Sequence, residues 1–139
     1  MRVIFAFAML LFALAAPVLA QTDHTPWQAS VTGQIEAFRA GDGATALTFA
    51  GEAFRTQFEG QPEAFYAAIA ASGYAAIIES RSHSFGTFEK VGEDTVLQVV
   101  KFVAPDQSLY EAAYQLRNEP GEGWRVIGVA LRKAAGIAI

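Results

Sequence analysis

Four segments in the second half of the chain are rich in β-branched and aromatic residues, and clusters of Gly, Pro, Asp and Asn separate them. Val, Ile, Thr, Phe and Tyr favour strands, whereas the residues of the clusters favour turns. The pattern predicts four β-strands, at residues 79–91, 95–104, 108–118 and 124–131. Because the links between them are short, we expect antiparallel neighbours that form a four-stranded meander.

The apolar residues of these strands are distributed differently over the two faces of the predicted sheet. The third strand is of the half-buried type, with Tyr110, Ala112, Tyr114 and Leu116 on one face and Glu111, Gln115 and Arg117 on the other. The second is apolar on both faces, with Val96, Val100 and Phe102 opposite Leu97, Val99 and Val103. The fourth is similar, with Trp124, Val126 and Ala130 opposite Ile127, Val129 and Leu131. One layer of helices covers only one face, so we expect a homodimer through the outer sheet face.

The first half of the chain has the spacing of amphipathic helices. A stripe of apolar residues spaced four, four and three apart predicts a helix over residues 26–40, namely Trp27, Val31, Ile35 and Phe38. Capping and turn residues predict two further helices, one at residues 43–50 and one that begins at Pro62 and stops at Gly73. Helices followed by strands indicate an α+β domain, with three N-terminal helices packed on the antiparallel meander.

Three segments are less well defined by their pattern. Residues 53–59 fit either a helix or a short strand, and we favour irregular or 3₁₀ structure there. We expect residues 74–78 to be an apolar connector into the first strand. The tail at residues 134–139 either extends the last strand or docks on an apolar surface.

The first 20 residues have the three-part pattern of a secretory signal peptide. Arg2 precedes the uncharged apolar run at residues 3–16, and small residues stand near position 20. We expect cleavage after residue 20, which leaves residues 21–139 as a single exported domain, periplasmic or secreted. The alternative is an uncleaved membrane anchor, for which the apolar stretch is barely long enough.

Composition narrows the classes of function. The sequence has no Cys, which excludes disulfides, thiolate metal sites and a Cys nucleophile. Its formal net charge is −4, with 10 basic and 14 acidic residues and no basic cluster. We therefore expect neither a nucleic acid nor an anionic membrane as partner.

Three sequence stretches in fixed order carry a resemblance to a known family. They are QIEAFRAGDG at residues 34–43, Gly73-Tyr74, and GWRVIG at residues 123–128. With them the chain resembles the NTF2-like (cystatin-like) superfamily, and more narrowly the bacterial family called domain of unknown function 4864. The resemblance implies a curved sheet wrapped around helices as a cone, a pocket inside it, and dimers through the outer sheet face. It implies no particular reaction, because the superfamily hosts isomerases, dehydratases, transport factors and binding domains.

His83 is the candidate for catalysis. Strand alternation places it on one face with Arg81 and Phe85, so an enzyme on this fold would use His83 with Arg81 or a tyrosine for proton transfer or hydration. The alternative is a hydrogen-bonded His on a partly exposed strand, because no Asp, Ser or metal ligand accompanies it at motif spacing. His24 is remote in sequence, so we expect no metal site and no cofactor.

Five aromatic residues are candidates for lining a ligand cavity, namely Tyr66, Tyr74, Tyr110, Tyr114 and Trp124. The alternative for each is an ordinary place in the core. The function stays open between three interpretations. They are a non-catalytic module that binds a small apolar ligand or serves as a scaffold, an enzyme based on His83, and a dimeric protein-interaction subunit.

Overall fold

The structure of the protein is a computed structural model that describes residues 25–134. The predicted signal peptide at residues 1–20 and the tail beyond Ala134 lie outside the described residues. Among the helices within that range, none has the length and hydropathy needed to cross a membrane.

The longest helix within residues 25–134, α2 (Trp27–Arg39), confirms the amphipathic pattern. All four residues of the predicted stripe are buried, with exposed fractions between 0% and 5%. The helix ends where Gly41 adopts a φ of 71°, in the left-handed region that glycine enters without strain. The spacing of the stripe therefore identified both the helix and the face that it buries.

Four shorter helices follow within the described residues, namely α3 (Gly43–Thr48), α4 (Glu52–Gln57), α5 (Pro62–Ala71) and α6 (Ala75–Ile78). The predictions of α3 and α5 are confirmed. The predicted count of three helices is wrong for two reasons. Residues 53–59, which we expected to be irregular or 3₁₀, are largely helical in α4. The connector expected at residues 74–78 contains the helical turn α6. Such short helices have little stability of their own, so contacts with the rest of the molecule determine them.

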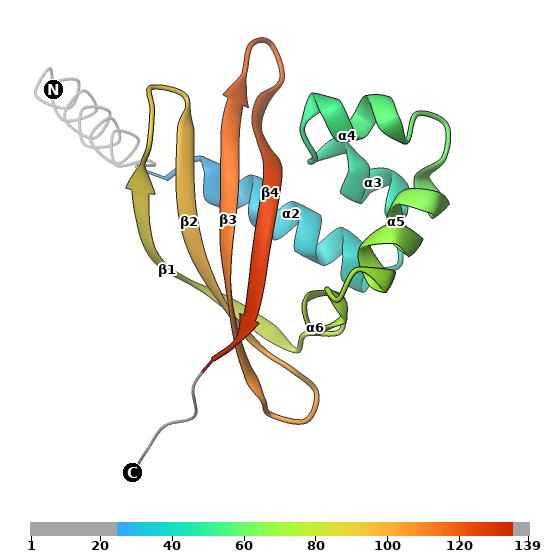
Figure 1. Ribbon diagram of the computed structural model, residues 1–139, viewed down its shortest axis with the longest axis vertical. Helices are drawn as coiled ribbons and strands as arrows, with labels where there is room; N and C mark the ends of the chain where they lie inside the picture. Colours follow the sequence, from blue (N-terminus) through green and yellow to red (C-terminus); the bar gives the residue numbers. More distant parts are fainter. Residues whose placement is uncertain (1–24, 135–139) are drawn as a thin grey trace, which may run out of the picture.

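The predicted meander is confirmed. Its strands are β1 (Ser82–Lys90), β2 (Thr95–Val103), β3 (Leu109–Glu119) and β4 (Gly123–Lys133). They form one antiparallel sheet in the order β1-β2-β3-β4. Figure 1 shows α2 lying across one face of this sheet, whereas α3, α4 and α5 lie beyond its β4 edge. The domain is thus α+β, with its helices gathered on one face and one edge.

One extra residue in β4 changes which side chains share a face. Val126 pairs with Leu116, but Gly128 pairs with the adjacent Gln115, so Ile127 forms a bulge. Beyond the bulge the alternation is reversed, and Val129 lies on the same face as Val126. The outer face of β4 then consists of Arg125, Gly128, Ala130 and Arg132, as their partners in β3 show. The prediction that β4 is apolar on both faces is therefore wrong.

The core is divided into two hydrophobic clusters. The first lies between α2 and the sheet and contains Trp27, Val31, Ile35, Ile77, Val96, Val100, Phe102, Ala112, Tyr114, Leu116 and Val126. The second joins the end of α2 to the short helices and contains Ala37, Phe38, Ala46, Ala50 and Phe65. α2 therefore holds the sheet on one part of its surface and the short helices on another.

Candidate functional site

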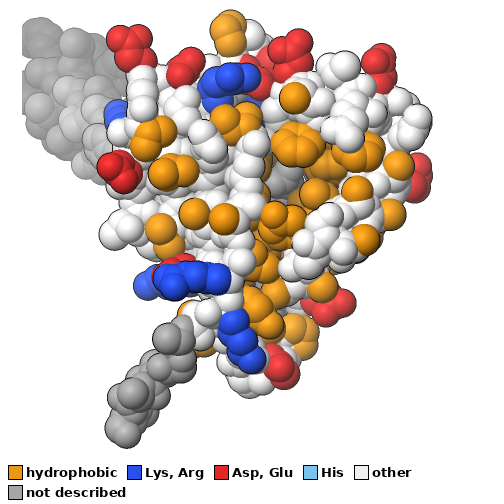
Figure 2. Space-filling model, viewed as in Figure 1, with side chains coloured by type: hydrophobic (Ala, Val, Ile, Leu, Met, Phe, Trp, Pro, Cys, Tyr) orange, Lys and Arg blue, Asp and Glu red, His pale blue; other side chains and the backbone are white. Residues whose placement is uncertain are grey.

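A cavity of about 320 Å³ lies between α4 and α5 on one side and the end of α2 and strands β3 and β4 on the other. Figure 2 shows it as a hollow lined by hydrophobic side chains that opens on the surface of the molecule. Its volume is near the lower end of the range for sites that hold small molecules, roughly 300–1,000 Å³. The cavity is therefore large enough for a small ligand.

Aromatic rings form one wall of the cavity. Phe65 of α5 lies at its centre and is 2% exposed. Its ring centroid is 5.9 Å from that of Phe38, 5.4 Å from that of Phe58 and 6.3 Å from that of Phe54. Phe54 lies in α4 and Phe58 directly follows it, and their spacing of four directs both rings to the same side. The wall is thus a cluster of four phenylalanine rings contributed by α2, α4 with its C-cap residue, and α5.

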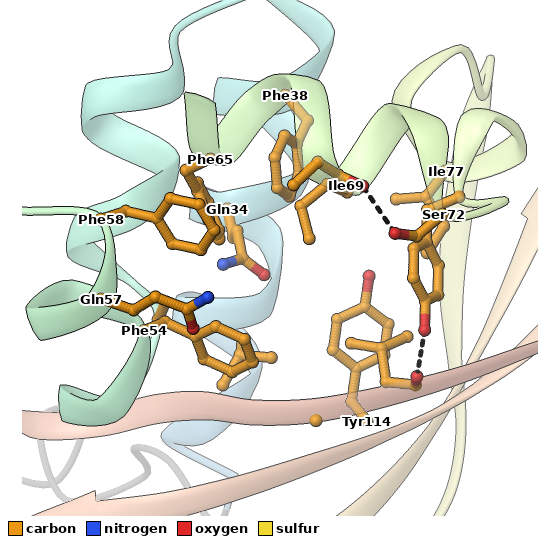
Figure 3. Close-up of a pocket in the computed structure, with 16 residues that line it drawn as sticks. Gln34, Phe38, Phe54, Gln57, Phe58, Phe65, Ile69, Ser72, Ile77 and Tyr114 are labelled. Atoms are coloured by element: carbon orange, nitrogen blue, oxygen red, sulfur yellow. Dashed lines mark hydrogen bonds between the residues drawn. The ribbon is translucent and has the colours of Figure 1, made fainter. Parts of the chain in front are cut away.

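Gln34 of α2 contributes an amide group from the floor of the cavity. Its side chain is 4% exposed, and its Nε2 donates a hydrogen bond to the carbonyl oxygen of Ala46 at 3.1 Å. This bond fixes the orientation of the amide, because the reverse assignment would place two oxygens against each other. The Oε1 atom has no hydrogen-bond partner among the described residues and faces the cavity (Figure 3).

Tyr114 of β3 is the second polar group directed into the cavity. The residue is 2% exposed, and its hydroxyl makes no hydrogen bond to any residue that the structure describes. Figure 3 shows the hydroxyl pointing into the same space as the Gln34 amide oxygen. Burial raises the pKa of Tyr114 far above its usual value, more than the charge of Arg39 lowers it, so the hydroxyl is neutral.

The other polar groups of the lining are already engaged or lie at the rim. The Tyr74 hydroxyl donates to the carbonyl oxygen of Val129 at 2.7 Å, and the Ser72 hydroxyl donates to that of Ala68 at 2.6 Å. Gln57 is exposed. No residue of the lining carries a charged side chain. The unpaired polar atoms of buried lining residues therefore come from Gln34 and Tyr114, and exposed Gln57 adds an amide without a hydrogen bond among the described residues.

The wall formed by α4 is attached to the hairpin that joins β3 and β4. Glu119 is 6% exposed and accepts hydrogen bonds from the backbone N–H of Glu52 at 2.9 Å and from Arg55 at 3.2 Å. Burial alone would raise the pKa of Glu119, but these bonds outweigh it and hold the pKa below its usual value. At Gly51 an added Cβ would lie 2.7 Å from a methyl carbon of Ile127, so this close approach requires glycine.

His83 lies outside this cavity, between α2 and the edge of the sheet. Its Nδ1 is 3.2 Å from the guanidinium of Arg39, and its Nε2 is 3.2 Å from the hydroxyl of Thr32. A guanidinium only donates, so Nδ1 accepts and the proton is on Nε2, which donates to Thr32. Burial and the charge of Arg39 lower the pKa of His83, whereas Glu36 raises it, so the ring is neutral near pH 7. Both ring nitrogens are therefore occupied by structural hydrogen bonds.

The other candidates are divided between the cavity and the rest of the molecule. Tyr74 and Tyr114 line the cavity, but Tyr66, Tyr110 and Trp124 do not. Trp124 packs edge-on against Trp27, and Tyr66 donates a long bond to the carbonyl oxygen of Phe38. Arg81 is exposed, and among the described residues the guanidinium beside His83 is that of Arg39. No group of three potential His, Cys, Asp or Glu ligands gathers within residues 25–134.

The sequence interpretation missed the amide of Gln34 and the phenylalanine wall. A signal for Gln34 was present, because Gln34 follows Val31 by three and precedes Phe38 by four, on the buried side of α2. A polar residue on an apolar stripe needs a hydrogen-bond partner or a ligand. The phenylalanines gave no such signal, because a phenylalanine that packs in the hydrophobic core has the same sequence pattern as one that lines a cavity.

Comparison with protein families identifies a match that covers most of the chain. The family model described as Domain of unknown function (DUF4864) matches residues 20–139. A search of curated proteins returned no match to the chain.

Proposed function

The chain belongs to the DUF4864 family, and we propose that it is a non-catalytic binding module that holds a small, largely apolar molecule in the cavity beside β4. The observation that carries the proposal is a cavity of about 320 Å³ with an aromatic wall, no charged lining residue, and unpaired polar atoms on the buried residues Gln34 and Tyr114. Apolar surface in contact with water is unfavourable, so a ligand that covers it gains free energy.

The surroundings of His83 favour binding over catalysis. A general base needs a free nitrogen, whereas Nδ1 of His83 accepts from Arg39 and Nε2 donates to Thr32. Arg81, its expected partner, is exposed. An enzyme that uses His83 with Arg81 or a tyrosine is therefore the less supported alternative.

We also propose that the domain is of the NTF2-like type and is exported to the periplasm or secreted. The first part is supported by a long helix across one face of a bulged antiparallel sheet and by a cavity between helices and sheet. The second is supported by the sequence pattern of residues 1–20 alone.

A neutral fluorescent probe tests the binding proposal. N-phenyl-1-naphthylamine should become brighter when it binds to the wild-type protein and should raise the melting temperature. Ala68→Phe places a ring in the cavity from α5 and should abolish both effects. Ala67→Phe is the matched control, because Ala67 is exposed on the same helix and does not line the cavity. Equal loss of binding in both variants, or no binding by the wild type, would contradict the proposal.

A homodimer through the outer sheet face is a second candidate. It is supported by half-buried Leu97, Val99 and Val103 on the outer face of β2, and by Leu109, which is 41% exposed. Val99→Lys should then convert a dimer into a monomer in sedimentation at micromolar concentration, whereas Ala67→Lys on α5 should not. Monomeric wild-type protein under these conditions would rule out the dimer.

A further inference from the structure

We propose that the ligand of this cavity carries a neutral hydroxyl group, which donates a hydrogen bond to Oε1 of Gln34 and accepts one from the hydroxyl of Tyr114. The inference rests on the proposed binding function and specifies the chemical class of the ligand as an alcohol or phenol with an apolar body.

Gln34 presents an acceptor to the cavity. One N–H of its Nε2 donates to the carbonyl oxygen of Ala46 at 3.1 Å, and this bond holds the amide so that Oε1 is directed inward (Figure 3). A group that satisfies Oε1 must donate a hydrogen bond. Because Gln34 is 4% exposed, a partner reaches this oxygen from within the cavity.

Tyr114 offers a neutral hydroxyl from the opposite side. Its ring is buried in the core, and its hydroxyl enters the space that the Gln34 amide also faces. A phenolic hydroxyl both donates and accepts. A ligand hydroxyl between the two residues can therefore accept from Tyr114 while it donates to Gln34.

Other ligand groups fit this pair less well. A carboxylate would meet the oxygen of Gln34, with no cation in the lining to balance its charge. An ammonium group would find no carboxylate there. A ketone would satisfy Tyr114 but leave Gln34 unpaired, and a hydrocarbon would leave both unpaired. A neutral hydroxyl both donates and accepts, so it satisfies both atoms.

The phenylalanine wall identifies where the rest of the ligand lies. Phe54, Phe58 and Phe65 come from α4, its C-cap position and α5, across the cavity from β3, which carries Tyr114. The apolar body then packs against these rings, and the hydroxyl points towards α2 and β3. This arrangement favours a compact, preferably planar molecule of a size that about 320 Å³ can hold.

The experiment compares three probes with nearly the same ring system, namely 2-naphthol, 2-methylnaphthalene and 2-naphthoate. Each probe competes with N-phenyl-1-naphthylamine for the purified protein. At about pH 7 the naphthol is neutral and the naphthoate is charged. We expect 2-naphthol to bind about tenfold more tightly than 2-methylnaphthalene, and 2-naphthoate to bind most weakly.

Tyr114→Phe should strongly reduce the preference for 2-naphthol, because the ligand hydroxyl loses its donor and 2-methylnaphthalene no longer leaves a tyrosine hydroxyl unpaired. The variant should fold, because the lost hydroxyl makes no hydrogen bond within residues 25–134. Tyr66→Phe is the matched control, since its hydroxyl lies outside the cavity, and it should keep the preference.

The possible failures are distinguishable. If 2-methylnaphthalene competes as well as 2-naphthol, or if Tyr114→Phe keeps the preference, the hydroxyl inference is wrong while the binding function stands. If 2-naphthoate binds as tightly as 2-naphthol, the hydroxyl inference is also wrong. If N-phenyl-1-naphthylamine itself does not bind, the binding function and this inference both fail.

Discussion

The carboxylate of Glu119 at the end of β3 accepts a hydrogen bond from the backbone N–H of Glu52 at 2.9 Å, and thereby fixes the first turn of α4 to the sheet. The two residues are 67 positions apart in the chain. A six-residue helix is too short to be stable by itself, and its free N–H groups attract a negative charge. One wall of the cavity therefore depends on a carboxylate that lies outside it.

Glu119→Gln should lower the free energy of unfolding by about 2 kcal/mol, because a charged acceptor in a buried position is lost. It should also weaken the binding of N-phenyl-1-naphthylamine, since α4 carries Phe54 and Gln57 of the lining. Urea unfolding and a fluorescence titration measure the two effects. Glu122→Gln is the control, because its carboxylate is 52% exposed. Equal effects of both substitutions would refute a special role for Glu119.

His83 should make stability depend on pH in the mildly acidic range. Its folded pKa is lower than its ordinary value of 6.5, so the unfolded chain binds a proton first as the pH falls. The stabilising contribution is complete above 6.5 and is lost as the pH falls through the folded pKa. Wild-type protein should therefore lose more stability between about pH 7.5 and about pH 5.5 than His83→Gln does. Identical losses in urea unfolding would show that the imidazole is not perturbed.

Gln98 should be as important for the sheet as an apolar core residue. It is 0% exposed, accepts a hydrogen bond from Nε1 of Trp27 at 2.7 Å, and donates to the carbonyl oxygen of Gly86 at 3.1 Å. Gly86 lies where the register of β1 shifts, so Gln98 satisfies backbone that the ladder leaves unpaired. Gln98→Leu should cost about 2 kcal/mol or more in thermal or urea unfolding. Gln115→Leu, on the exposed outer face of β3, should cost much less.

Deletion of Ile127 should be tolerated better than insertion of an alanine after Gly128. Ile127 has no partner in β3, so its deletion joins Val126 to Gly128 in a regular ladder and leaves Val129 and Leu131 on the inner face. The insertion would turn Val129 and Leu131 towards solvent, since successive residues of a strand alternate between faces. We expect the insertion variant to aggregate on gel filtration and the deletion variant to remain soluble. A soluble insertion variant with wild-type thermal stability would contradict the assignment of faces.

The sequence predicted the structure best where the spacing of apolar residues repeats without interruption. The stripe of α2 and the order of the four strands follow from spacing and turn residues, and the structure confirms both. The faces of β4 could not be obtained in this way, because a single extra residue reverses the alternation and no turn residue marks it. The helix α4 was missed because its stability depends on Glu119, which is distant in sequence.

The site was only partly accessible from the sequence. Tyr74 and Tyr114 were among the candidates and line the cavity, but so were Tyr66, Tyr110 and Trp124, which pack elsewhere. An aromatic residue has the same local pattern whether its ring fills the core or borders a cavity. The difference arises from how α4 and α5 are placed against β4, which is a property of the tertiary structure.

The division of the core into two hydrophobic clusters creates regions that can open independently. Phe65 and the helix that carries it belong to the smaller cluster, away from the long ladders of β2 and β3. Amide protons of α4 and α5 should therefore exchange with deuterium well before those of the central strands. Transient opening of these helices would let a ligand enter the cavity while the sheet stays intact. The least stable region of the described structure would then also be the entrance to the cavity.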